Sequence, residues 1–453
     1  MLNSMDTLVS LCKRRGFIFP GSEIYGGLGG TWDYGPLGAL LKNNIKQAWL
    51  RRFVQSRGDV EYIDGTVLMA RRTWQASGHE ASFSDMLVEC KYCHARYRAD
   101  HMAEGAYKGQ GKAKEVNQCT ECGKSTFTDP KQFNMMFATH VGPVADEDRK
   151  TYLRPETAQS MFTNFANVSE SVRRTPPFGI AQIGRCFRNE ITTGNFIFRS
   201  REFEIAELEY FVKPGTDEKY FEAWLADWEK FFIEDLKISK DNLRHYEHPK
   251  ESLAHYSKRT VDLEYKFPFG WGEIAGVANR TDYDLKRHTE FSKQELSVFE
   301  EATKESYVPY VIEPTLGIDR AFVTCLINHY EEIQGGRTTT TESTKEAEVV
   351  LHLPPALAPY KMAVLPLSKK EPLTTLAKEI TKTLRTQFSC AYDEAASIGR
   401  RYRRHDEIGT PYCVTIDFDS LDDKQVTVRD RDTMKQERVE VQELSQYLKD
   451  KIA

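Results

Sequence analysis

Hydrophobic positions near the C-terminus follow two patterns in turn. Short apolar runs rich in β-forming residues at Met362–Leu365, Tyr412–Ile416 and Val426–Val428 predict strands. Apolar residues at helical spacing over Leu373–Leu384, and again over Val441–Ile452, predict two helices. Because strands alternate with helices here, we expect a small α/β unit with a mostly parallel sheet.

The first 340 residues show helix-like and strand-like stretches in blocks instead. Gly38–Phe53 and Tyr220–Leu236 carry apolar residues on one helical face, whereas Trp74–Val88 and Ile180–Phe211 contain strand-like pieces. This order favours an α+β fold with an antiparallel sheet. The Gly, Thr and Ser residues of Gln334–Glu346 read as a linker or exposed loop between the two units.

The composition is that of a globular chain of more than one domain. The 453 residues are 40% hydrophobic and 28% charged, and a formal charge of −5 excludes a protein that coats nucleic acid over its whole surface. A local basic patch is still allowed. No apolar run approaches the roughly 18 residues of a membrane span, and the N-terminal run is too short for a secretion signal. We therefore expect a cytoplasmic protein with no membrane partner.

The common nucleotide-binding loops are missing. Gly109–Lys114 lacks the closing Gly-Lys-Ser/Thr of a phosphate loop, and Gly26–Gly30 lacks the Rossmann spacing. Between Gly184 and Tyr210, arginines alternate with glutamates and phenylalanines, which predicts a β-hairpin closed at Thr192–Asn195. Residues two apart share a face of a strand, so Arg188 would align with Glu190, Arg201 with Phe203, and Phe203 with Ile205 and Glu207. A salt-bridged surface hairpin would show the same pattern.

Distant segments resemble the class II aminoacyl-tRNA synthetases. Phe187–Glu190 and Phe198–Phe203 resemble the second signature motif of that class, Gly317–Arg320 the third, and Tyr34–Gly38 the first, which forms the dimer interface. Segments that resemble the glycine enzymes of the class are Trp74–Asp85, Arg154–Gln159, Trp271–Gly276 and Glu313–Arg320. The matches cover nearly the whole chain in family order. They imply a glycyl-tRNA synthetase of the homodimeric, eukaryote/archaeal-like type.

This resemblance implies a domain plan and a reaction. A class II catalytic domain is expected over 1–345, with a zinc-binding insert at about 88–126 and a helical insert at about 214–260. An anticodon-binding α/β domain is expected over 346–453. The reaction would join glycine to ATP as glycyl-adenylate, release pyrophosphate, and then transfer glycyl to the 3′ end of tRNA(Gly).

The resemblance also implies an ATP site built on fixed cations. Arg188 would bridge the α-phosphate and the glycine carboxylate, while Arg199 and Arg320 hold the β- and γ-phosphates. Glu190 would accept from the adenine amino group and Phe203 would stack on the base. Glu202 and Glu273 would hold Mg²⁺, and Arg188, Glu202 and Arg320 form the expected catalytic set. The full expected ATP set is Arg188, Asn189, Glu190, Phe198, Arg199, Ser200, Arg201, Glu202, Phe203, Glu273, Ile274, Gly317, Ile318, Asp319 and Arg320.

By the same resemblance, acidic residues would hold the glycine ammonium. Glu156, Glu207 and Glu313 match the family's acidic residues, although each taken alone is more often a structural carboxylate. The full expected glycine set is Arg98, Glu156, Phe203, Glu204, Ile205, Ala206, Glu207, Glu313, Pro314, Thr315, Leu316 and Gly317. Two residues depart from the family pattern. Thr315 stands where serine is usual beside the α-carbon, and Ser160 stands where glycine is common.

Four of the nine cysteines form two CxxC pairs, Cys90/Cys93 and Cys119/Cys122. Two such pairs predict a tetrahedral Zn²⁺ site of four thiolates, which leaves no open position for catalysis. Two pairs without metal are the alternative. The expected role of zinc is to brace the insert that carries Arg98. The unpaired cysteines indicate a reducing compartment.

The densest basic cluster, Gly399–His405, falls on a predicted helix of the C-terminal unit. Arg400, Arg403 and Arg404 would contact tRNA phosphates, although a solvated helix face is the alternative. Asp217–His255 would form an inserted helical lobe over the acceptor stem.

Two other functions remain open from the sequence. A catalytically silent relative that only binds would not need Arg188, Glu190, Phe203, Glu273 and Arg320 together. A synthetase for another small amino acid would not need Glu156 and Glu313.

Overall fold

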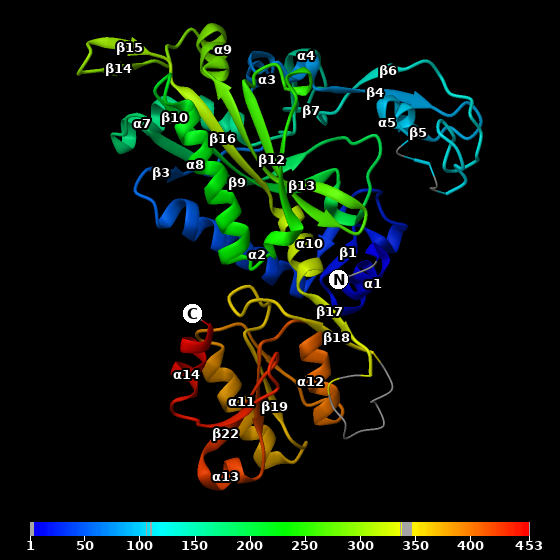
Figure 1. Cartoon of the computed structure of the whole chain (residues 1–453), viewed down its shortest axis with the longest axis vertical. Helices are drawn as coiled ribbons and strands as arrows, with labels where there is room; N and C mark the ends of the chain where they lie inside the picture. Colours follow the sequence, from blue (N-terminus) through cyan, green and yellow to red (C-terminus); the bar gives the residue numbers. More distant parts are fainter. Residues whose placement is uncertain (1–3, 106, 109–110, 336, 338–346, 453) are drawn as a thin grey trace.

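The computed structural model of the chain has a large body built on a wide sheet and a smaller C-terminal unit below it (Figure 1). The structure describes residues 4–105, 107–108, 111–335, 337 and 347–452. Most of the predicted linker Gln334–Glu346 lies outside these residues, and the domain boundary at residue 345 stays a prediction. No helix of the described ranges is long and apolar enough to cross a membrane.

A seven-stranded sheet forms the centre of the large body. Its strands lie in the order β11-β12-β13-β16-β10-β9-β3, and all neighbours are antiparallel except β3 and β9. The bounds are β3 (Val60–Tyr62), β9 (Phe178–Phe187), β10 (Glu202–Val212), β11 (Leu243–Glu247), β12 (Arg259–Phe267), β13 (Gly270–Thr281) and β16 (Tyr310–Gly317). The predicted α+β fold with an antiparallel sheet is confirmed.

Helices cover both faces of this sheet. One group is α2 (Pro36–Leu50), α8 (Asp217–Lys230) and α10 (Ile318–Asn328), and the other is α6 (Ala158–Thr163), α7 (Phe165–Val172) and α9 (Tyr283–Ser292). Along β10, Leu208 and Tyr210 pack with the first group, whereas Phe211 packs with the second. Alternate residues of a strand point to opposite faces, so Phe203 and Glu207 share the face of Phe211.

The two helices predicted in this body are confirmed. α2 begins at Pro36, whose fixed φ suits the first helical turn, and it buries Leu41, Ile45 and Trp49. α8 buries Phe221, Trp224 and Trp228 in the same core. Because α8 packs on the central sheet and β11 extends that sheet, the segment 214–260 adds a helix and a strand to this body. Its role as a helical insert over the acceptor stem stays a prediction.

Two strand predictions need correction. Within Trp74–Val88, the short helices α3 (Arg71–Ala76) and α4 (His79–Ser82) meet at Gly78, and only β4 (Ser84–Glu89) is a strand. β9 and β10 pair as predicted, with Phe187 opposite Glu202. They are joined not by a tight turn but by residues 188–201, in which Gly194 and Arg199 form an isolated bridge.

The cysteine-bearing insert stands at the side of the main sheet (Figure 1). It contains a three-stranded sheet of β4, β5 (Arg96–Arg98) and β6 (Lys131–Asn134), together with α5 (Ala99–Ala103). Val88, Cys90, Tyr97 and Cys119 belong to a small core of its own. The local fold thus depends on few apolar side chains.

The C-terminal unit has a five-stranded sheet in the order β20-β19-β21-β22-β23. β19 pairs in parallel with β20 and β21, whereas β22 pairs antiparallel with β21 and β23, so two of the four pairs are parallel and the sheet is mixed where a mostly parallel one was predicted. The connections that precede β22 and β23 are too short for the crossover that a parallel pair needs. The bounds are β19 (Met362–Pro366), α11 (Glu371–Leu384), β20 (Cys390–Tyr392), α12 (Ile398–Glu407), β21 (Tyr412–Ile416), α13 (Asp419–Asp423), β22 (Gln425–Asp430), β23 (Gln436–Glu440) and α14 (Leu444–Ile452).

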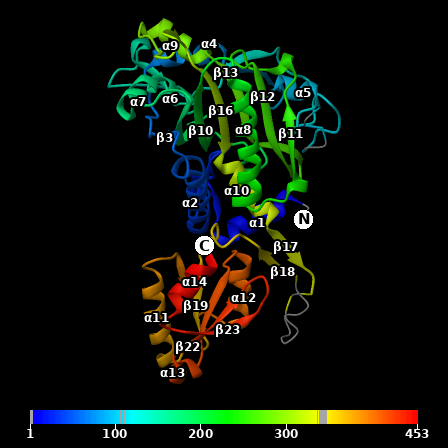
Figure 2. The ribbon, with the colours of Figure 1, turned by 60° about the vertical axis from the view of Figure 1, so that its left-hand side comes forward.

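The two bodies meet near α2 and α1 (Met5–Arg15), as both ribbon views show (Figures 1 and 2). Arg14 and Arg15 of α1 pair with Glu407 at the end of α12. The strands β17 (Tyr330–Ile333) and β18 (Glu348–Leu351) form a hairpin-like pair at the junction. These contacts connect the C-terminal unit to the large body.

Candidate functional site

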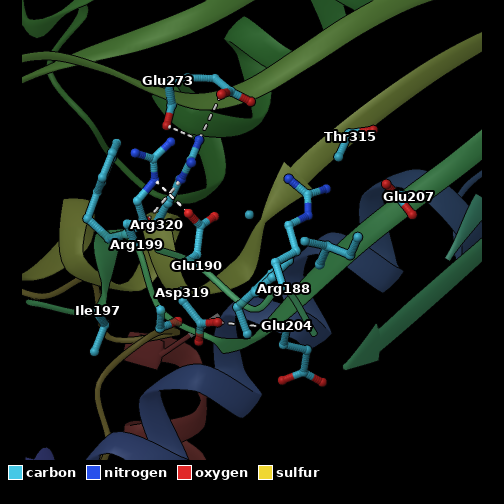
Figure 3. Close-up of a pocket in the computed structure, with 15 residues that line it drawn as sticks. Arg188, Glu190, Ile197, Arg199, Glu204, Glu207, Glu273, Thr315, Asp319 and Arg320 are labelled. Carbon is cyan, nitrogen blue, oxygen red and sulfur yellow. Dashed lines mark hydrogen bonds and ion pairs between the residues drawn. The ribbon is translucent and has the colours of Figure 1, made fainter. Parts of the chain in front are cut away.

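A pocket opens beside β10, β13 and β16, at the start of α10 (Figure 3). The connection between β9 and β10 supplies its other wall. Its lining residues are Arg188, Glu190, Ile197, Phe198, Arg199, Ser200, Phe203, Glu204, Ile205, Glu207, Glu273, Thr315, Gly317, Asp319 and Arg320. The structure thus brings together residues that lie more than a hundred positions apart in the chain.

Two of the three predicted cations are paired with carboxylates in this pocket (Figure 3). Arg320 Nη1 lies 2.9 Å from Glu273 Oε2, and Arg199 Nε lies 3.7 Å from Glu190 Oε2. Glu190 Oε2 has no hydrogen-bond partner among the described residues although Glu190 is buried. It can therefore accept from a donor on a ligand, such as a purine amino group.

Arg188 is held between two aromatic rings. Its guanidinium carbon lies 5.3 Å from the ring centre of Phe203 and 5.4 Å from that of Phe83, and its Nε donates to the Pro155 carbonyl at 3.1 Å. Figure 3 shows the side chain extending toward Thr315 and Glu207. Arg188 thus stands between the other arginines and the acidic residues of the sheet.

Asp319 connects the third signature segment to Tyr34 of the first, to α2 and to β10. It accepts from Lys42 Nζ at 2.7 Å, from the Tyr34 hydroxyl, and from the backbone N–H of Glu204 at 2.7 Å. Burial and the nearby Asp319 carboxylate raise the pKa of Tyr34 well above its ordinary value. Tyr34 and Lys42 therefore fix the beginning of α10, and with it Arg320, relative to β10.

Five residues of the expected ATP set lie outside the pocket lining: Asn189, Arg201, Glu202, Ile274 and Ile318. Glu202 projects to the other face of β10 from Phe203 and pairs with Arg185. The Arg201 side chain donates to the backbone carbonyls of Gly29 and Glu190. Their roles stay predictions, and Glu202 lies apart from the Glu273 carboxylate that shares its predicted magnesium role.

The acidic side of the pocket is formed by buried glutamates. Glu207 Oε2 accepts from the N–H groups of Thr157 and Ala158, at 2.6 and 3.1 Å. Burial, together with the charges of Glu313 and Glu156, raises the pKa of Glu207 to about 8. A ligand ammonium beside these carboxylates would therefore relieve their mutual repulsion.

Glu313 and Glu156 lie behind the lining. Glu313 accepts from Arg280 Nη1 at 2.7 Å, and the Thr315 hydroxyl lies 3.4 Å from its other oxygen. Glu156 accepts from Gln159 at 2.9 Å and lies 3.2 Å from His79 Nε2. Burial raises the pKa of Glu156, but the charges of His79 and Arg280 and the hydrogen bonds outweigh it, so the pKa is lowered.

Of the rest of the expected glycine set, Phe203, Glu204, Ile205 and Gly317 line the pocket, and the other four residues do not. Ala206, Pro314 and Leu316 are buried in the sheet and do not line the pocket, as the alternation of β10 and β16 requires. Arg98 lies in the insert, where it pairs with Asp85 at 2.9 Å and Asp100 at 2.7 Å. The structure does not bring Arg98 into the pocket lining, and its role stays a prediction.

Sequence reasoning missed several buried polar residues behind the pocket. Arg280 is wholly buried, forms two hydrogen bonds to Asp284 at 2.8 and 2.9 Å, and lies 3.9 Å from the ring centre of Tyr256. Neither carboxyl oxygen of Glu209 has a hydrogen-bond partner among the described residues, and burial raises its pKa well above the ordinary value. Glu209 is one of four glutamates in β10, so nothing in the sequence distinguishes it, and the partners of Arg280 come from other elements, which its position in β13 does not reveal.

The four predicted zinc ligands come together in the insert. The ligand atoms of Cys90, Cys93, Cys119 and Cys122 all lie within 4.8 Å of one another. The sulfurs of Cys90 and Cys122 are 3.6 Å apart, and those of Cys93 and Cys119 are 3.4 Å apart. Tetrahedral Zn²⁺ with bonds of about 2.3 Å needs sulfurs about 3.8 Å apart, so this donor set fits zinc.

The basic cluster lies on α12 as predicted, but its arginines differ in surroundings. Arg400 is exposed, whereas Arg404 pairs with Asp393 at 2.7 Å and Arg403 lies 3.8 Å from Glu348. Arg401 is 2% exposed and donates to the Pro366 carbonyl at 2.6 Å. Part of the cluster therefore stabilises the unit itself.

Comparison with known proteins bears on both bodies. Residues 137–330 match the family model of the tRNA synthetase class II core domain (G, H, P, S and T), and residues 361–451 match that of the anticodon binding domain. The glycine–tRNA ligase of Thermobifida fusca is 52% identical over 99% of this chain and 98% of its own.

Two further glycine–tRNA ligases cover nearly the whole chain. That of Streptomyces coelicolor is 53% identical over 98% of each chain, and that of Geobacillus kaustophilus is 51% identical over 100% of each. These relatives are bacterial, so the predicted eukaryote/archaeal-like type is not confirmed.

Proposed function

Since this chain belongs to the glycine–tRNA ligase family of class II aminoacyl-tRNA synthetases, we propose that the pocket around Arg188 is where glycine and ATP react. The position of Arg188 carries the proposal. This cation stands between Arg199 and Arg320 on one side and the buried carboxylates of the sheet on the other.

The first step is attack of a glycine carboxylate oxygen on the α-phosphorus of ATP, with pyrophosphate as the leaving group. Arg188 would contact both the attacking carboxylate and the α-phosphate, where negative charge develops. Arg199 would leave its ion pair with Glu190, and Arg320 its ion pair with Glu273, and the two arginines would bind the β- and γ-phosphates instead. The site thus works by positioning and charge, without a protein nucleophile.

Base recognition would use the two groups that the pocket offers. The Phe203 ring lies beside Arg188 and supplies a stacking surface, while Glu190 Oε2 accepts from the adenine amino group. In the second step, a hydroxyl at the 3′ end of tRNA(Gly) attacks the glycyl carbonyl, and AMP leaves.

Class II synthetases use ATP with Mg²⁺ in general, and Glu273 fits the ion because its carboxylate faces the pocket. Bound Mg²⁺ would supply charge neutralisation at the phosphates. Glu202 would have to leave Arg185 to take part, which makes it the weaker candidate.

Glycine would be held by charge and selected by lack of room. Glu207, with Glu156 and Glu313 behind it, would attract the ammonium, and Thr315 would close the space beside the α-carbon. Larger amino acids would then clash, and no smaller one exists to compete.

The remaining parts of the proposal concern the rest of the molecule. Structural Zn²⁺ would be held by the four cysteines of the insert and brace Arg98. The C-terminal unit would bind the tRNA anticodon, with Arg400, Arg403 and Arg404 near phosphates. A homodimer would form about the first signature motif, where Ile24, Tyr25 and Leu28 are exposed. We place the protein in the cytoplasm, where tRNA is charged.

Glycine-dependent exchange of pyrophosphate into ATP tests the proposal, with alanine and serine in place of glycine as controls. Exchange with glycine but not with alanine or serine supports the proposal. Arg188→Lys should lower kcat at least a hundredfold, about the effect of removing one hydrogen-bond donor from the transition state. ATP binding without any exchange would favour the silent relative instead.

A further inference from the structure

We propose that the segment Ser77–Phe83 positions the glycine site, because His79 orients Glu156 and Phe83 orients Arg188. The inference rests on the proposed function, which has Glu156 and Arg188 act on glycine. His79 and Phe83 are positioning residues, since neither lines the pocket.

Both ring nitrogens of His79 have partners. Nε2 lies 3.2 Å from Glu156 Oε2, and Nδ1 lies 2.8 Å from the Ser77 hydroxyl. Ser77, His79 and Glu156 are all buried. The Ser77 hydroxyl donates to the Trp74 carbonyl at 3.3 Å and contacts Nδ1 on the other side. The serine thus fixes the orientation of the ring, so that Nε2 faces Glu156.

Glu156 is held from both sides as a result. Its Oε1 accepts from Gln159, and its Oε2 faces His79. The other charged groups that act on it are Arg280 of β13, Glu207 of β10 and Glu313 of β16. Of these, only Arg280 favours the ionised carboxyl, so His79, Arg280 and the hydrogen bond from Gln159 together keep Glu156 charged for an ammonium.

Phe83 connects this arrangement to the carboxylate side of the site. Its ring centre lies 5.2 Å from that of His79, and the Arg188 guanidinium lies over it at 5.4 Å and over Phe203 at 5.3 Å. The backbone of Phe83 is fixed by hydrogen bonds to His79 at 3.1 Å and Met135 at 3.0 Å. A cation between two fixed rings has little freedom to turn.

Matched variants of the full-length enzyme separate positioning from packing. His79→Gln is compared with His329→Gln, since His329 is equally buried but bonds the Leu236 carbonyl instead. Phe83→Leu is compared with Phe165→Leu, a buried ring of a different cluster. The readouts are kcat and the KM values for glycine and ATP in pyrophosphate exchange.

His79→Gln is expected to raise the KM for glycine about tenfold, the worth of a hydrogen bond to a charged group, with the KM for ATP within about twofold. Ser77→Ala should raise the KM for glycine about threefold. This variant still tests the inference if His79→Gln does not fold. Phe83→Leu should lower kcat as well, because Arg188 acts in the transition state. His329→Gln and Phe165→Leu should leave the ratio of the two KM values unchanged.

The pH profile supplies a second readout. In His79→Gln, the acid limb of kcat/KM for glycine should move to higher pH, because Glu156 loses a partner that lowers its pKa. The inference is overturned if His79→Gln and Ser77→Ala match His329→Gln, or if both KM values rise together. A wild-type enzyme without glycine-dependent exchange would instead overturn the proposed function.

Discussion

At the scale of single residues, Thr315 tests how the smallest amino acid is selected. Its hydroxyl lies 3.4 Å from Glu313 and its methyl adds bulk at the pocket wall. Thr315→Ser keeps the hydroxyl, so the KM for glycine should change less than about threefold and kcat should be retained. The extra room should raise exchange with alanine. A large loss of kcat would show that the methyl has a role other than exclusion.

Glu207 predicts a dependence of stability on pH. Its folded-state pKa of about 8 lies above the unfolded value, so the folded protein binds more protons between roughly pH 4.5 and 8. The contribution of Glu207 to stability therefore falls as pH rises through that range. In thermal unfolding, the Tm of the wild type should fall between pH 6 and pH 9. The Tm of Glu207→Gln should fall much less over the same range. Equal slopes would contradict the raised pKa.

The residue predictions from sequence worked where the local conformation was regular. Phe203, Ile205 and Glu207 share the pocket because they lie on one strand, β10, as their alternation required. The same rule does not apply to Arg201, which lies before the strand and points to Gly29. Arg280 escaped notice because its partners come from other elements, which spacing alone does not reveal.

At the scale of elements, Asp319 links α10 to α2 and β10. Asp319→Asn removes the charge that Lys42 and Tyr34 contact, while Lys42 keeps Glu204 at 3.1 Å. We expect a lower Tm and about a tenfold higher KM for ATP, because Arg320 follows Asp319 directly. Asp284→Asn is the control, since Asp284 contacts Arg280 on the glycine side and should change the KM for glycine more. If each variant changed the KM for ATP and the KM for glycine equally, Asp319 would not act mainly on ATP binding and Asp284 would not act mainly on glycine binding.

The cysteine insert is an element whose fold should depend on metal. With a core of few apolar residues, it lacks another large source of stability. Metal analysis should find about one zinc per chain, and Cys119→Ser should lose it and expose the insert to proteolysis. Cys390→Ser, in the C-terminal unit, should keep the metal. Full zinc content in Cys119→Ser would exclude this cysteine as a ligand.

Element types were predictable where periodicity was strong, as in α2, α8, α11 and β21, whereas strand pairing was predicted correctly for β9 and β10 but not for the C-terminal sheet. The antiparallel addition of β22 and β23 follows from short connections that a hydrophobic pattern does not encode. Likewise, a helix within 214–260 was predictable, whereas the packing of its buried Trp224 and Trp228 against the sheet was not.

At the scale of the whole molecule, binding of tRNA should require the C-terminal unit while activation of glycine should not. Arg400 is exposed on α12, but Arg401 is buried and donates to the carbonyls of Pro366 and Asp393. Arg400→Glu should therefore raise the KM for tRNA several-fold without changing pyrophosphate exchange. If Arg400 contacts a phosphate, the slope of log K against log salt should fall by about one.

Arg401→Leu is the contrasting variant, because it removes donors from buried carbonyls at the ends of β19 and β20. It should lower the Tm of the C-terminal unit through those unpaired groups, whatever the salt concentration. A salt-dependent loss in Arg401→Leu, with no effect of Arg400→Glu, would place the phosphate contact elsewhere. Since both residues lie on one helix, comparing Arg400→Glu with Arg401→Leu separates an arginine that contacts tRNA from one that stabilises the C-terminal unit.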